Sequence, residues 1–197
     1  MMIETERLLL KPYTEQMADD VFKVVSKKEI ADTMLMIPHP YPRKQLDAWL
    51  LYLQKSFELG SAFEYAVFAK EAPDRYIGNC GLVSVSQTHQ SGEVGYFIDP
   101  SEWGKGYASE ACRKLVDIGF AVHGLNRLFG RCLVRNPASR KVLENSGMTF
   151  EGRFKQEFRM NGMYEDTDYL AILATEYDDK KALDSLRTHY KAPSHSE

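Results

Sequence analysis

Cysteine is scarce in this sequence: three occur among 197 residues, and they lie far apart at Cys80, Cys112 and Cys132. Neither a disulfide framework nor a Cys-x-x-Cys motif is therefore expected, and the three are predicted to be reduced, mostly buried thiols of a cytoplasmic protein. The five histidines show no metal-ligand spacing with cysteines or carboxylates, so no metal site is expected.

Long apolar runs and an excess of positive charge are also lacking. No run of about 18 apolar residues occurs, and the charged start MMIETERLLL is unlike a signal peptide. The formal net charge is −3, without a Lys/Arg-rich run. We therefore expect neither a membrane span nor a nucleic-acid partner, and the length indicates one globular domain.

The most informative segment is GEVGYFIDPSEWGKGYAS, residues 92–109. Strand-forming residues end at Asp99, a turn with Gly104 and Gly106 follows, and helical spacing of apolar residues begins at Ala108. This order aims backbone N–H groups and the positive end of a helix dipole at one point, which suits a phosphate. On the glycines alone, an ordinary strand-to-helix connection explains the segment equally well. The spacing matches neither GxxxxGK[ST] nor GxGxxG.

WGKGYASEA after this strand resembles the acetyl-CoA signature of the GNAT N-acetyltransferases, in particular the RimJ/RimL-like branch that modifies protein N-termini. That signature reads Gln/Arg-x-x-Gly-x-Gly/Ala. Trp103 stands at its first position, a replacement usual in this branch, and Gly106 and Ala108 stand at the fourth and sixth. The resemblance implies that acetyl-CoA is the acetyl donor and that it contacts Phe97, Ile98, Trp103, Gly104, Lys105, Gly106, Tyr107, Ala108, Ser109, Asn136 and Ser139.

A second segment, NPASRKVLENSGM, begins at Asn136. Asn136 is a good N-cap, Pro137 suits the first helical position, and Gly147 suits the end of a short helix. The segment resembles the family's Asn-x-x-Ser followed by a helix and Gly-Phe, with Met148 in place of the aromatic residue. The resemblance implies that Asn136 binds the pantetheine arm and that Ser139 lies near the thioester sulfur. Taken alone, the segment is a simple helix start.

The other elements are predicted from hydrophobic periodicity and turn residues. The segment 127–135 shows little alternation, so it is predicted to be buried on both faces. Together with the resemblance, the order of elements predicts a GNAT fold of the α/β (α+β) class: a twisted, mixed, mostly antiparallel sheet of about seven strands flanked by helices. The domain is expected to span 1–175, followed by a C-terminal helix and polar tail at 176–197. The predicted strands are 3–11, 63–70, 76–86, 93–98, 127–135, 150–160 and 165–174, and the predicted helices are 14–26, 43–59, 108–123 and 136–147.

The resemblance also implies a mechanism of direct acetyl transfer in a ternary complex. Backbone N–H groups of the central strand, at or next to Phe97 and Ile98, would polarise the thioester carbonyl. Glu93 is the predicted general base, acting through a water, and the alternative is an ordinary exposed strand carboxylate. A covalent route through Cys112 or Cys132 is not expected, because neither has a neighbouring histidine.

Two positions depart from the family pattern. The tyrosine that many GNAT enzymes use as a general acid would fall at Leu143, so Ser139 is the expected substitute. The glutamate that some members carry on the penultimate strand would fall at Phe158. Glu157 lies one residue earlier and should face the other side of the sheet unless a bulge intervenes.

The predicted acceptor is a protein or peptide α-amine, whose pKa near 8 leaves about a tenth of it neutral at pH 7. The alternatives are a small amine, such as a polyamine or aminoglycoside, and a non-catalytic acyl-CoA sensor. His39 and Tyr41, in the proline-rich segment 34–42, and Glu157 are the substrate-contact candidates. An exposed turn that Tyr41 packs onto the following helix explains that segment equally well. A monomer and a homodimer are both compatible with the sequence.

Overall fold

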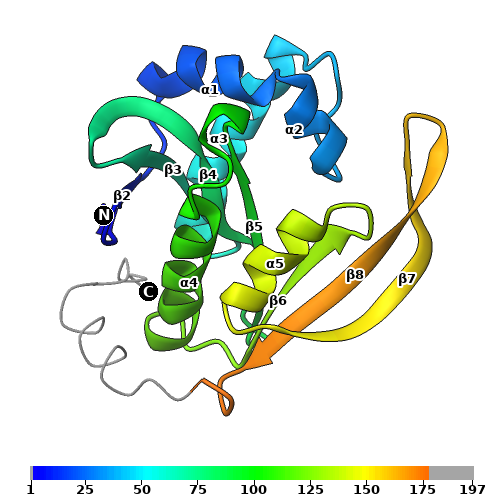
Figure 1. Cartoon of the computed structure of the whole chain (residues 1–197). Helices are drawn as coiled ribbons and strands as arrows, with labels where there is room; N and C mark the ends of the chain where they lie inside the picture. Colours follow the sequence, from blue (N-terminus) through cyan, green and yellow to red (C-terminus); the bar gives the residue numbers. More distant parts are fainter. Residues whose placement is uncertain (1, 178–197) are drawn as a thin grey trace.

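A single sheet of eight strands organises the computed structural model, which describes residues 2–177 (Figure 1). The strand order is β1-β2-β3-β4-β5-β6-β8-β7, and every neighbouring pair is antiparallel except β5 and β6. The strands are β1 (Ile3–Glu4), β2 (Leu8–Lys11), β3 (Phe63–Ala69), β4 (Ala72–Ser86), β5 (Ser91–Ile98), β6 (Arg127–Leu133), β7 (Thr149–Met160) and β8 (Met163–Leu173). The helices are α1 (Ala18–Val25), α2 (Lys28–Thr33), α3 (Arg43–Leu59), α4 (Tyr107–Ala121) and α5 (Pro137–Asn145), with 3₁₀ turns η1 (Glu15–Met17) and η2 (Pro100–Glu102).

Helices cover both faces of the sheet around β3, β4 and β5. Because side chains alternate along a strand, Val94 and Ile98 of β5 pack in the core that contains α4, whereas Phe97 packs in the core that contains α1 and α3. α4 follows β5 and returns the chain to its parallel partner β6. The result is a layered α/β fold, as the sequence predicts.

The parallel contact between β5 and β6 is short. It joins Ser91, Gly92 and Glu93 to the segment that begins at Arg127 and ends at Phe129. Beyond this point β5 continues to Ile98 along β4, and β6 continues to Leu133 along β8. The two strands therefore separate in the middle of the sheet and leave an opening that other elements can line.

The N-terminal half differs from the prediction in three places. The strand predicted at 3–11 is a small hairpin, because Thr5 turns the chain: its N–H donates to Leu8 O (3.0 Å) and its Oγ1 accepts from Leu8 N (2.9 Å). This split explains eight strands instead of about seven. The helix predicted at 14–26 begins as the 3₁₀ turn η1, which Thr14 precedes without a side-chain cap. The short helix α2 was not predicted.

The prediction that strand 127–135 is buried on both faces is wrong. In β6, Leu128, Gly130 and Cys132 are buried, whereas Arg127 and Arg131 are half-buried. The buried face packs on α5: a Cβ added to Gly130 would lie 2.5 Å from Leu143 Cδ2. The alternation arises because α5 covers only one face of this strand.

The hairpin of β7 and β8 turns at Asn161 and Gly162, as predicted, with positive φ at both residues (49° and 84°). It extends away from the helical layers in Figure 1. No helix among residues 2–177 is long and apolar enough to cross a bilayer. Cys80, Cys112 and Cys132 are buried free thiols. Of the predicted C-terminal helix and tail, only Glu176 and Tyr177 lie within the described residues.

Candidate active site

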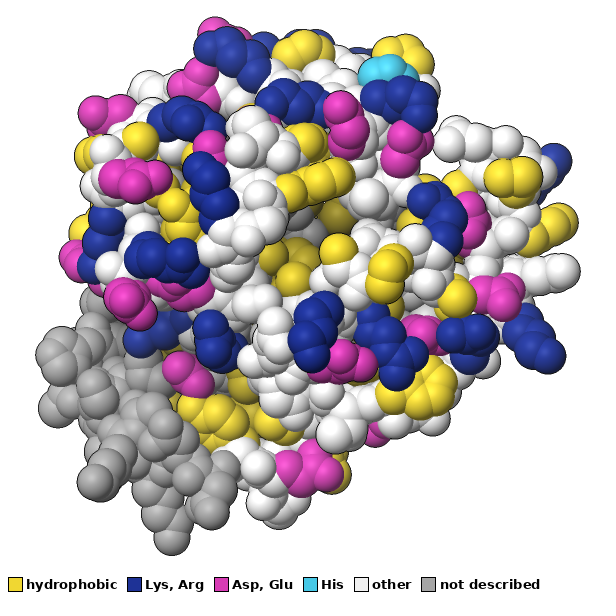
Figure 2. All heavy atoms as spheres, in the orientation of Figure 1, with side chains coloured by type: hydrophobic (Ala, Val, Ile, Leu, Met, Phe, Trp, Pro, Cys, Tyr) yellow, Lys and Arg dark blue, Asp and Glu magenta, His cyan; other side chains and the backbone are white. Residues whose placement is uncertain are grey.

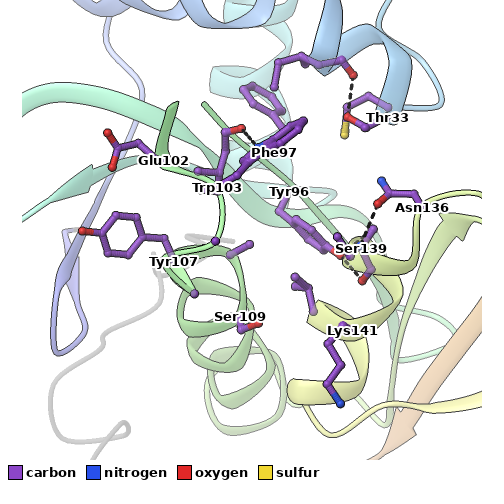
Figure 3. Close-up of a pocket in the computed structure, with 18 residues that line it drawn as sticks. Thr33, Tyr96, Phe97, Glu102, Trp103, Tyr107, Ser109, Asn136, Ser139 and Lys141 are labelled. Carbon is purple, nitrogen blue, oxygen red and sulfur yellow. Dashed lines mark hydrogen bonds between the residues drawn. The ribbon is translucent and has the colours of Figure 1, made fainter. Parts of the chain in front are cut away.

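A cavity of about 380 Å³ lies at the opening between β5 and β6 (Figure 3). It brings together most residues of the two predicted segments, although these segments are about 30 residues apart in the chain. In Figure 2, hydrophobic side chains form the floor of a hollow near the centre of the molecule, with Lys and Arg side chains around it. The predicted residues that line it are Phe97, Ile98, Trp103, Gly104, Gly106, Tyr107, Ala108, Ser109, Asn136 and Ser139, and they are joined by Ile30, Thr33, Met34, Tyr96, Glu102, Ala138, Lys141 and Val142.

The turn before α4 has the backbone of an anion-binding loop. Gly104 and Gly106 have φ of +80° and +81°, a conformation that favours glycine. Gly106 is the N-cap of α4 and has no side chain with which to cap the first N–H groups of that helix. These N–H groups and the positive end of the helix dipole suit a pyrophosphate at the cavity mouth.

The turn is held in place by residues from the other end of the sequence. Arg7 donates from Nη1 to Lys105 O (2.9 Å) and from Nε to Glu110 Oε2 (2.7 Å). Thr5 Oγ1 donates to Glu110 Oε1 (2.5 Å), and Arg7 N donates to the same oxygen (2.8 Å). Arg7 also lies over the ring of Tyr107, 5.0 Å from its centroid. The turn between β1 and β2 is therefore fastened to the first turn of α4 and to the turn that precedes this helix.

Replacing Arg7 with Ala is expected to weaken acetyl-CoA binding severalfold while leaving kcat nearly unchanged, because Arg7 orders the turn but does not line the cavity. Titration calorimetry with acetyl-CoA measures this change. Arg43→Ala is the matched control, since Arg43 is also half-exposed, bonds a carboxylate (Asp19, 2.7 Å) and lies over an aromatic ring. Equal affinities for both variants would contradict this role of Arg7.

Trp103 and Lys105 bond to the protein on either side of the turn. Trp103 Nε1 donates to Ile98 O (2.7 Å), which ties the turn to the free end of β5. Lys105 Nζ donates to Glu102 Oε2 (2.7 Å), and Arg75 bonds the other oxygen of that carboxylate. The bond from Lys105, together with Arg75, lowers the pKa of Glu102. Lys105 therefore lies at the rim and does not line the cavity.

The start of α5 closes the cavity opposite β5. Asn136 Oδ1 accepts from Ser139 N (3.1 Å), which is the predicted N-cap bond. The hydroxyl of Tyr96 of β5 lies 2.8 Å from both Ser139 O and Ser139 Oγ, so its one proton can be donated to either oxygen. Burial raises the pKa of Tyr96 well above its usual value, so this phenol holds its proton at neutral pH. Leu143 is fully buried and packs against β6.

Glu93 is the last residue of β5 that pairs with β6, and it does not line the cavity. Arg131 of β6 donates to both of its carboxylate oxygens, from Nε (2.7 Å) and Nη2 (3.0 Å). The other terminal nitrogen of Arg131 is 3.9 Å from Glu157 Oε1. One arginine therefore lies between the predicted base and the predicted acceptor-contact carboxylate.

Glu157 reaches this cluster through a bulge in β7. The register with β8 shifts between Phe154 and Phe158, and Gln156 has φ of +53°. The Glu157 carboxylate accepts from Tyr169 OH (2.5 Å) and from the hydroxyl of Thr167. The sequence predicts that Glu157 faces the other side of the sheet unless a bulge intervenes. The structure contains that bulge.

The remaining two predicted contacts lie outside the cavity. Tyr41 is 8% exposed and packs in the core of α1 and α3, with its ring 6.4 Å from that of Phe22, whereas His39 is exposed. Ile30 and Thr33 of α2, and Met34 directly after it, line the cavity instead. Sequence reasoning missed α2 because it is short, and it missed Tyr96 because this residue read as an ordinary strand aromatic.

The chain is similar to known acetyltransferases both in sequence and in structure. The family description "Acetyltransferase (GNAT) domain" matches residues 7–149. The uncharacterized N-acetyltransferase p20 of Bacillus licheniformis is 31% identical over 173 residues, covering 88% of this chain and 96% of p20. RimL, a ribosomal L7/L12 α-N-protein acetyltransferase solved with coenzyme A, superposes with a TM-score of 0.79 at 21% identity, covering 88% of this chain and 98% of RimL. Spermidine N-acetyltransferase from Vibrio cholerae, solved with CoA and spermine, superposes with a TM-score of 0.77 at 22% identity. The superposition covers 89% of this chain and 100% of that enzyme.

Proposed function

Since this chain belongs to the GNAT acetyltransferase family, we propose that its acceptor is the α-amino group of a protein or peptide N-terminus. As a member of that family it is an N-acetyltransferase that takes its acetyl group from acetyl-CoA. The acceptor is the part of the reaction that the two structural neighbours leave open, because one is named for a ribosomal protein and the other for spermidine.

The cavity offers candidate contacts for three parts of acetyl-CoA: the pyrophosphate, the pantetheine arm and the thioester carbonyl. Gly104, Gly106 and the first N–H groups of α4 would hold the pyrophosphate, and Asn136 the pantetheine arm. β5 has a strand partner on only one side between Val94 and Ile98, so its backbone is accessible from the opening between the strands. A backbone N–H at Phe97 or Ile98 would act as a fixed dipole for the developing oxyanion.

The pairing of carboxylates on the face of the sheet opposite α5, where we propose that the acceptor binds, is the observation that carries this proposal. Glu93 and Glu157 share Arg131, and Glu165 of β8 accepts from Arg135 (2.8 Å). A polyamine carries several positive charges along its length and is best matched by carboxylates without partners of their own. A peptide N-terminus brings a single amine, and these paired charges suit it better.

We propose Glu93 as the base that accepts the proton of this amine, through a water. Replacing it with Gln is expected to lower kcat about tenfold at pH 7, with the loss shrinking above pH 8 as the α-amine becomes neutral without help. The pH dependence of kcat with a peptide acceptor measures this. Glu151→Gln, a change at another strand carboxylate paired with an arginine (Arg127, 2.7 Å) and outside the set of carboxylates on which the proposal rests, is the control. A loss in the Glu93 variant that is the same at every pH would assign Glu93 a structural role.

The acceptor is tested by thiol release from acetyl-CoA in the presence of peptides beginning with Ala, Ser or Thr, of spermidine and of an aminoglycoside. Mass spectrometry of the products locates the acetyl group. Release with peptides and a mass shift at the α-amine is the expected result. Release with spermidine alone would replace the proposed acceptor by a polyamine, and silence with every amine would favour the acyl-CoA sensor.

A further inference from the structure

We propose that Tyr96 is the source of the proton that the departing CoA thiolate receives, and that the hydroxyl of Ser139 relays it. This inference depends on acetyl transfer at the cavity but not on the identity of the acceptor. It assigns to the central strand a task that the resemblance placed in α5.

The geometry that supports this assignment is a contact across the opening between β5 and β6. Figure 3 shows the Tyr96 side chain directed from β5 to the first turn of α5, where its hydroxyl meets Ser139. Both residues line the cavity, and their oxygens lie 2.8 Å apart. The leaving sulfur of a donor whose carbonyl lies at Phe97 or Ile98 would be released between this strand and this helix.

The position in α5 where many relatives carry an acid is occupied by a side chain that cannot donate a proton. Leu143 is fully buried, and its methyl groups fill the space left by Gly130 on β6. The phenol of Tyr96 instead reaches the first turn of α5 from β5, where it meets Ser139. Ser139 lies one helical turn before Leu143, at the end of α5 that faces β5.

Acid strength separates the two hydroxyl groups. A serine hydroxyl is a much weaker acid than a phenol, so Ser139 acting alone would leave an alkoxide behind. An ordinary phenol has a pKa of about 10 and an ordinary thiol about 8.5, so proton transfer from phenol to thiolate is unfavourable by only about thirtyfold. Burial raises the pKa of Tyr96, and apolar surroundings also disfavour a thiolate released beside it, so both anions are destabilised there.

The proton transfers balance in the following step. The amine nitrogen bonds to the acetyl carbon, and the C–S bond breaks with its electron pair on sulfur. The Ser139 O–H proton passes to sulfur while the Tyr96 O–H proton passes to Ser139 Oγ, which leaves a thiol, a restored serine and a phenolate. The nitrogen loses its proton to the base and on to solvent, and the phenolate takes one back from solvent.

A purely structural role is the alternative, because the same bonds hold α5 against β5. Tyr96→Phe separates the two roles when kcat and acetyl-CoA affinity are measured together. We expect kcat to fall tenfold or more with the dissociation constant within twofold of wild type. The double variant with Ser139→Ala should lose no more than the more damaging single change, since both hydroxyl groups act in one path. Tyr76→Phe is the matched control: Tyr76 is also a buried phenol in a hydrogen bond (3.1 Å to Tyr13 OH), and it lies outside the cavity.

A second readout depends on acidity and not on shape. Incorporating fluorinated tyrosines at position 96 makes the phenol more acidic while preserving its hydrogen bonds. If Tyr96 supplies the proton, the alkaline limb of the kcat profile moves to lower pH with each added fluorine. The assay uses whichever amine of the panel turns over, or water as acceptor, so a wrong acceptor does not affect it. An alkaline limb that stays in place, or a Tyr96→Phe variant with kcat within twofold of wild type, would overturn the proposal.

Discussion

Replacing Gly106 with Val is expected to raise the dissociation constant for acetyl-CoA more than a hundredfold, which corresponds to about 2.8 kcal/mol of binding free energy. Gly106 has φ of +81°, where a β-branched residue is strained, and it precedes the first N–H groups of α4. Among residues 2–177, a Cβ there would meet only Arg7 Nη2, at 3.5 Å. The side chain would instead occupy the space through which the pyrophosphate approaches the backbone.

Backbone strain and exclusion of the ligand could both lower the affinity of the Gly106 variant for acetyl-CoA. A control variant just beyond the other end of α4 separates these two causes. Gly124 has φ of +62°, and a Cβ added there meets no other atom of the described part of the chain within 4 Å. Gly124→Val therefore carries comparable strain at a site away from the cavity. Calorimetry and thermal unfolding of both variants are the measurements. We expect similar losses of stability and a loss of acetyl-CoA binding only in the Gly106 variant, and unchanged affinity in that variant would refute the pyrophosphate assignment.

Glu64 of β3 is expected to make the stability of the protein fall as the pH rises above 4.5. Glu64 as a residue is 8% exposed, and its carboxylate accepts from Asn79 Nδ2 (2.7 Å). Burial raises its pKa to about 7 against an ordinary value of 4.5, so the folded protein binds more protons than the unfolded chain within this interval. Because the raised pKa means that the folded protein holds this proton more tightly, the contribution of Glu64 to the free energy of unfolding is fully present below pH 4.5. It is lost as the pH rises through 7.

The expected size of this effect follows from the shift of about 2.5 pH units, which is worth about 3 kcal/mol at 1.36 kcal/mol per unit. Urea unfolding of wild type and Glu64→Gln between pH 4.5 and 8 measures it. The free energy of unfolding of wild type relative to the variant should fall by this amount across the interval. Glu58→Gln, a change at an exposed carboxylate of α3, is the control, and parallel curves for wild type and Glu64→Gln would show that Glu64 does not titrate as stated.

The features that could be predicted from sequence depend on neighbouring residues. Gly104 and Gly106 mark a turn because glycine accepts positive φ, and Asn161 with Gly162 marks a hairpin for the same reason. Asn136 caps α5 because its side chain reaches an N–H three residues ahead. Local rules of this kind, with the resemblance, were enough to place the two segments that line the cavity.

The features that only the tertiary structure decided join residues far apart in the chain. Arg7 meets Glu110, and Tyr96 meets Ser139 across the gap where β5 and β6 separate. Glu157 lies beside Arg131 because a bulge shifts the register of β7 against β8. Strand register and separation arise from the packing of whole elements, and alternation along one strand carries no information about where its partner ends. The sequence by itself therefore determined the fold family and the two segments that line the cavity, whereas tertiary packing decided which polar side chains lie around that cavity.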